Sequence, residues 1–136
     1  MQITINGKAY QLYFGIKFIR ELDAKYWFGE ETVKFGAGLE NAWFKLQSHD
    51  LVILNDVLAA ALSTQFVFTD ADFDNFFAAQ TEEQLDQLYV DLVKNLETQP
   101  MTVKRVKQYE ANLKAVSVAN NPDEEEKKAP KKSTKA

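Results

Sequence analysis

The residues best suited to chemistry are a lone histidine and the glycines of one short segment. His49 is the only histidine and cysteine is absent, so a catalytic triad would depend on one side chain in a polar break at Ser48 to Asp50. Gly29, Gly36 and Gly38 lack the spacing and the lysine of a phosphate-binding loop. The sequence therefore favours a surface histidine and predicts no catalytic residue and no cofactor.

A triplet of carboxylates is the best candidate for a metal site. Asp70, Asp72 and Asp74 begin like a calcium-binding loop. Such a loop needs glycine where Asn75 stands and a bidentate glutamate where Thr81 stands. Acids that complement the dipole of a helix N-terminus explain the triplet better, so we predict no metal.

Acidic residues are concentrated in one part of the chain. The net charge is −4, whereas Thr69 to Glu97 contains eight acids and one lysine and so carries −7. A surface of that charge repels nucleic acid. The first residues lack the pattern of a secretion signal, and no stretch approaches the roughly 18 apolar residues of a membrane span. With no cysteine, we expect a cytoplasmic protein that binds neither nucleic acid nor membrane.

The N-terminal residues predict a β-hairpin. Ile3 and Ile5 alternate with polar residues, and alternation resumes from Lys8 to Phe14 after the pair Asn6-Gly7. This pair tolerates the positive φ angles of a two-residue hairpin turn. A two-stranded hairpin is marginal in water, so we expect its apolar face to pack on the rest of the domain.

Helical spacing of apolar residues predicts most of the remaining chain. After Gly15 one helix should turn four residues inward: Ile16, Ile19, Leu22 and Tyr26. Tyr26 to Gly38 is irregular and predicts a loop with room for one short turn of structure. Further helices are predicted at Leu39 to Leu46, at Leu51 to Leu62 with Asp50 as its cap, after Thr69 or Asp70, from a capping box at Thr81 to Glu97, and at Met101 to Ala115. Because Leu51 to Leu62 is apolar around so much of its circumference, we expect it at the centre.

These elements predict an α+β fold that is predominantly helical. An N-terminal β-hairpin packs on a bundle of about five to six helices, and one domain of this size can bury an ordinary core. We predict that residues 1–116 form this domain and that residues 117–136 are a disordered charged tail. Four consecutive acids from Asp123 and five lysines without a large apolar residue are typical of disorder.

Aromatic residues gather between Tyr26 and Phe44, where they could fill the core or form a surface for a protein partner. Glu30, Glu31 and Glu40 are interleaved with them, which disfavours nucleic acid. Aromatic side chains are frequent energetic centres of protein interfaces. Our candidates for partner binding are Phe35, Gly36, Gly38, Leu39, Trp43, Leu51, Leu54 and Leu58, of which Phe35 and Trp43 could equally belong to the core.

Three segments, taken in order, resemble a known family. They are Met1 to Lys8 (MQITINGK) with Tyr10, Phe14 to Asp23 (FGIKFIRELD) and Phe35 to Glu40 (FGAGLE). Together they resemble the tail assembly chaperones of long-tailed phages of Gram-positive bacteria. The likeness is clear over residues 1–65 and continues after Thr69 as a likeness of organisation.

The resemblance implies a non-enzymatic chaperone of the host cytoplasm that is absent from the mature virion. Such a protein would bind the tape measure protein, keep its apolar helices soluble and help recruit subunits of the tail tube protein. Self-association is a further expectation. Family members often have a longer frameshifted form, and the pairs Lys127-Lys128 and Lys131-Lys132 fit either slippery codons or an ordinary tail. The rival interpretation is an acidic cytoplasmic adaptor or inhibitor that binds a basic partner through Thr69 to Glu97.

Overall fold

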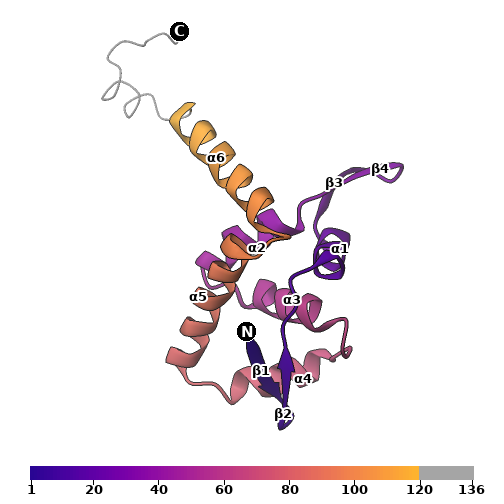
Figure 1. The fold of residues 1–136 in the computed structure, drawn as a ribbon, viewed down its shortest axis with the longest axis vertical. Coiled ribbons are helices and arrows are strands. Elements are labelled where there is room, and N and C mark those ends of the chain that lie inside the picture. Colours follow the sequence, from indigo (N-terminus) through magenta and orange to yellow (C-terminus); the bar gives the residue numbers. More distant parts are fainter. Residues whose placement is uncertain (120–136) are drawn as a thin grey trace. The chain divides into compact units, whose positions relative to one another are not determined.

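The fold is known from a computed structural model that describes residues 1–119. The described chain divides into two units, Met1–Val106 and residues 107–119. The elements, in order, are β1 (Gln2–Ile5), β2 (Lys8–Gln11), α1 (Ile16–Lys25), β3 (Trp27–Glu30), β4 (Val33–Gly36), α2 (Gly38–Gln47), α3 (Leu51–Leu62), α4 (Asp70–Ala78), α5 (Glu82–Thr98) and α6 (Val103–Ala119) (Figure 1). The predicted fold class, predominantly helical with an N-terminal hairpin, is confirmed. Helix α6 passes residue 117, and the rest of the predicted tail lies outside the described residues.

The predicted N-terminal hairpin is confirmed. Strands β1 and β2 pair antiparallel around the turn at Asn6-Gly7, where φ is 53° and 79°. Ile3 and Ile5 are buried on the inner face, and β1 contacts α4. The side-chain amide of Asn6 donates a hydrogen bond to Asp72 Oδ1 on α4 (3.2 Å). The first hairpin is therefore a packed part of the domain.

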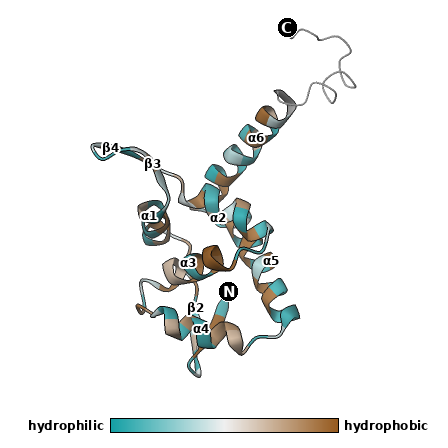
Figure 2. Cartoon of the chain, turned by 180° about the vertical axis from the view of Figure 1, so that it is seen from behind, coloured by the Kyte–Doolittle hydropathy of each residue, from teal (hydrophilic) through white to brown (hydrophobic). Residues whose placement is uncertain are grey.

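Helix α3 lies at the centre of the first unit, as its composition predicts. It contacts both α1 and α2, and α2 also contacts α5. Leu54, Val57, Leu58 and Leu62 are completely buried. In Figure 2, α3 is among the most hydrophobic helices, which agrees with burial on several sides.

Three helix starts are fixed by the side chains that the sequence indicates. Asp50 Oδ1 accepts a hydrogen bond from the backbone N–H of Ile53 (2.9 Å), which caps α3. Thr69 and Thr81 each form a complete capping box, in which Asp72 and Gln84 are the third residues of their helices. The acids of the supposed calcium triplet thus lie at the beginning of α4.

Two local predictions are corrected by the structure. Of the residues expected to turn inward after Gly15, Leu22 is buried, Ile19 and Tyr26 are half-buried and Ile16 is exposed, whereas Phe18 is buried. Helix α1 begins at Ile16 itself, and its contacts with α3 and α2 select the stripe through Phe18. The segment from Tyr26 to Gly38 is not a loop but contains the second antiparallel hairpin, β3–β4.

Candidate functional site

The second hairpin exposes apolar side chains that most domains would bury. All eight residues of β3 and β4 are exposed, and the hairpin extends away from the helices of the first unit (Figure 1). Large side chains contribute most of this surface: Phe28 is 61% exposed, Val33 56% and Phe35 52%. Exposed apolar patches of this kind mark interaction sites in monomeric proteins.

The strand register sorts these side chains onto two faces. Phe28 pairs with Phe35, and Glu30 pairs with Val33, so all four lie on one face. The rings of Phe28 and Phe35 stack with their centroids 5.3 Å apart. On the other face the ammonium group of Lys34 lies 4.4 Å from the centre of the Trp27 ring. We call the face with Phe28, Val33 and Phe35 the aromatic face.

One side of the hairpin base is held by Tyr26. The backbone N–H of Ala37 donates to the Tyr26 carbonyl (2.7 Å), which closes the hairpin beyond its last strand pair. The Tyr26 hydroxyl donates to Asp56 Oδ2 on α3. Burial and this hydrogen bond raise the pKa of Tyr26 above its ordinary value, so the hydroxyl keeps its proton.

The other side of the base is a carboxylate–arginine cluster formed by Asp23, Glu40 and Arg105. Asp23 Oδ1 accepts a hydrogen bond from the N–H of Gly38 (2.8 Å). Arg105 donates to both oxygens of Asp23 (2.7 and 3.1 Å) and to both oxygens of Glu40 (2.9 Å each). Hydrogen bonds to Glu40 and Asp23 raise the pKa of Arg105 further, so its charge is permanent.

The two glycines beside this cluster are required by close packing inside the chain. A Cβ on Gly36 would lie 2.2 Å from Cγ of Asp23, and one on Gly38 would lie 2.5 Å from Leu22. Both positions therefore let the end of β4 and the start of α2 rest against α1. These glycines therefore permit the close approach of α1 in the same chain.

The predicted partner-binding residues fall into two groups. Three are exposed, two of them in the second hairpin: Phe35, Gly36 and Leu51. Five are buried and could reach a partner only if the core opened: Gly38, Leu39, Trp43, Leu54 and Leu58. The Trp43 indole N–H donates to Glu97 Oε2 (2.8 Å), which ties α2 to α5. The sequence did not select Phe28 and Val33, which share the aromatic face with Phe35.

Among the residues considered for catalysis or metal binding, His49 lies just after α2 and the acid triplet Asp70, Asp72 and Asp74 lies in α4. No group of three His, Asp or Glu side chains among residues 1–119 could hold a metal ion. His49 stacks on Tyr89 (centroids 4.4 Å apart), and its Nδ1 lies 3.2 Å from Asp86 Oδ1. None of the described helices is both long enough and apolar enough to cross a membrane.

The fold and the exposed hairpin define a small helical domain that presents apolar side chains on a rigidly anchored element. A family model for phage tail assembly chaperone proteins (TAC) matches residues 2–110. The chain belongs to the phage tail assembly chaperone family. No curated protein and no solved structure matches it. A chaperone of this kind acts in the infected host cell on proteins of the phage tail.

Proposed function

We propose that this chain binds the tape measure protein through the aromatic face and keeps the apolar helices of that protein soluble until the tail tube protein is recruited around it. The role is non-enzymatic and belongs to the host cytoplasm, with release before the virion is complete. Membership of the chaperone family supports an assembly role.

The observation that carries this proposal is the exposed Phe28–Phe35 pair. Both rings lie outside the core, on a hairpin whose base is fixed by Tyr26 and by the carboxylate–arginine cluster. A fixed aromatic surface loses little conformational entropy when it binds, and its burial against the apolar stripe of a helix is favourable. The interface need not be large, because the chaperone must release the tape measure protein again.

The test is co-expression of the chaperone with fragments of the tape measure protein. We expect the native chain to raise the soluble fraction of apolar fragments and to co-purify with them. The double variant Phe28→Ser/Phe35→Ser should lose both effects, with affinity at least about tenfold lower because two aromatic contacts are removed. Phe66→Ser is the matched control, since Phe66 is 52% exposed but lies outside the hairpin.

Thermal unfolding of each variant followed by circular dichroism controls for loss of fold. Both variants should unfold close to the native temperature, because the substituted rings are exposed. A double variant that captures tape measure fragments as well as the native chain does would overturn the assignment of the aromatic face. A native chain that leaves every fragment aggregated would overturn the proposed function itself.

A further inference from the structure

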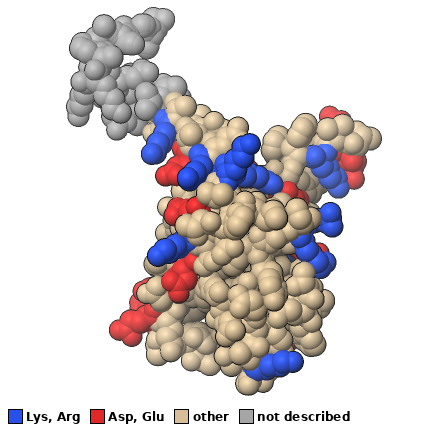
Figure 3. Space-filling view, viewed as in Figure 1, with Lys and Arg blue, Asp and Glu red and all other residues tan. Residues whose placement is uncertain are grey.

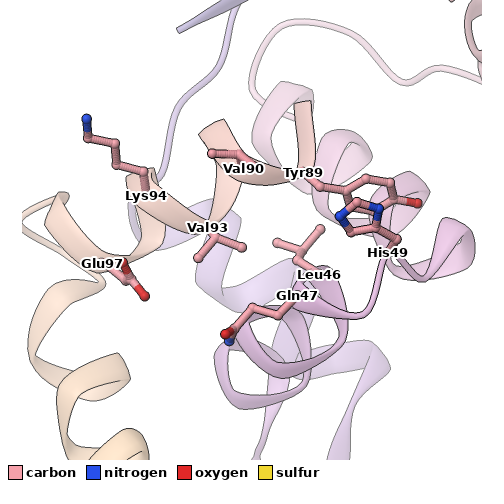
Figure 4. A pocket seen from close by; sticks show the side chains of 8 residues that line it. All are labelled: Leu46, Gln47, His49, Tyr89, Val90, Val93, Lys94 and Glu97. Carbon is pink, nitrogen blue, oxygen red and sulfur yellow. The ribbon is translucent and has the colours of Figure 1, made fainter. Parts of the chain in front are cut away.

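A groove of about 560 Å³ lies between α2 and α5, inside the first unit. Figure 4 shows Tyr89 and His49 at one end, Lys94 and Glu97 at the other, and Leu46 with Val93 between them. Val90, on the outer edge, is 55% exposed. The groove is distinct from the second hairpin, since none of its lining residues belongs to β3 or β4.

Side-chain contacts link α2 and His49 to α5 near each end of the groove. Near one end the Trp43 indole N–H donates a hydrogen bond to Glu97. At the other end the His49 ring stacks on Tyr89 and contacts Asp86. His49 has a φ of 58°, a left-handed conformation that turns the chain sharply at the end of α2. The middle of the groove therefore keeps an apolar lining, in which Val93 is partly exposed and Leu46 is fully buried.

The charge beside the groove is negative. Helix α5 carries five acids against Lys94, and acidic side chains follow the α5 edge in Figure 3. Glu97 lines one end of the groove, and Asp86, eleven positions earlier in the sequence, contacts His49 at the other end. On one helix that separation corresponds to about 16 Å, or three turns. An apolar floor with a carboxylate at each end complements a segment with an apolar centre and positively charged ends.

We propose that the groove between α2 and α5 is a second docking site, which takes an amphipathic helical segment of a partner tail protein with basic residues at both ends. Burial of the apolar stripe on Val90 and Val93 supplies affinity, and the two carboxylates select the basic ends and set the register. In this proposal the groove is the place at which the acidic stretch from Thr69 to Glu97 binds a basic partner. It is independent of the role proposed for the aromatic face.

The test uses a synthetic amphipathic peptide of about three to four turns, with a leucine stripe and lysines at both ends. A second peptide has glutamate in place of every lysine. Fluorescence anisotropy with the full chain should show that the lysine peptide binds at least tenfold more tightly at low salt, and that the preference shrinks at high salt. Equal binding of the two peptides, or of neither, would overturn the proposal.

Two valine variants locate the binding. Val90→Asp should weaken binding of the lysine peptide by about tenfold, because a contact with the apolar stripe is lost. Val52→Asp, at a valine that is 68% exposed on α3, should change it by less than about twofold. An equal loss in both variants would contradict the assignment, as would concentration-dependent dimers of the native chain that Val90→Asp abolishes.

The hairpin variant separates this proposal from the proposed function. Phe28→Ser/Phe35→Ser should bind the lysine peptide as the native chain does. Val90→Asp should still capture the tape measure fragments through the aromatic face. If the hairpin variant loses the lysine peptide, the peptide binds at the hairpin and the groove proposal fails, whereas the proposed function stands.

Discussion

The two hairpins of this protein have strands of the same length but opposite relations to the core. In β1–β2, Ile5 is 1% exposed and packs inward, whereas every residue of β3–β4 is exposed. The first hairpin contributes buried area to the fold, and the second contributes surface. Strand pairing alone therefore says nothing about whether a hairpin is structural or available to a partner.

The difference lies in what each hairpin is attached to. The first is stabilised along one face by α4, and Asn6 adds a hydrogen bond to Asp72. The second is held at its base, through Ala37 and the carboxylate–arginine cluster, while its faces stay in solvent. Because an isolated two-stranded hairpin is marginal in water, the anchored base is what keeps the second hairpin formed.

The largest expected effect contrasts one aliphatic residue in each hairpin. Ile5→Ala removes a buried side chain and should lower the free energy of unfolding by about 2–5 kcal/mol. Val33→Ala, on the aromatic face, should change it by less than about 0.5 kcal/mol. Urea denaturation followed by circular dichroism measures both. Similar losses of unfolding free energy in the two variants would mean that the second hairpin is also packed against the core, and the two hairpins would then not differ in this respect.

An intermediate effect is expected at the anchor of the second hairpin. Arg105→Met leaves Asp23 and Glu40 without their shared partner and should cost about 1–3 kcal/mol in urea denaturation. Amide hydrogen exchange should accelerate in β3–β4 more than in β1–β2, because only the second hairpin rests on this cluster.

The matched control for the anchor is Lys17→Met. Lys17 forms an exposed ion pair with Glu21 (3.1 Å), and such pairs contribute less than about 0.5 kcal/mol. If Arg105→Met cost no more than the control, or if exchange rose equally in both hairpins, the cluster would not be the anchor.

The smallest expected effect concerns the contact between the first hairpin and α4. The backbone N–H of Thr69, followed by the amide of Asn6, holds the pKa of Asp72 below its ordinary value of 3.8. A lowered pKa contributes stability above pH 3.8 that is lost as the pH falls through the folded-state value. Asp72→Asn should therefore lower the melting temperature slightly at pH 7, and the difference should vanish at strongly acidic pH.

Asp74→Asn, on the same helix, is the matched control for Asp72. Its melting temperature should follow that of the native chain more closely at every pH. If the melting temperature of Asp72→Asn stays below that of the native chain by the same amount in strong acid, the ionised carboxylate of Asp72 does not stabilise the contact between the first hairpin and α4.

The sequence by itself determined the elements whose causes are local. The positive φ angles at Asn6-Gly7, the cap at Asp50 and the capping box at Thr81 each depend on residues within a few positions of one another. The central place of α3 also followed from its apolar circumference. The three segments that resemble tail assembly chaperones lie inside residues 2–110, over which the family model matches, apart from Met1.

Only the tertiary structure decided which apolar residues are available to a partner. The turn of β3–β4 at Glu31-Thr32 carries no turn signal, so the second hairpin could not be read locally. Asp23 is bound by Arg105, which lies 82 positions away in the sequence. Trp43 and Phe35 belong to the same aromatic segment, yet one is buried and the other exposed. Burial depends on contacts between distant elements, and no pattern within a segment determines those contacts.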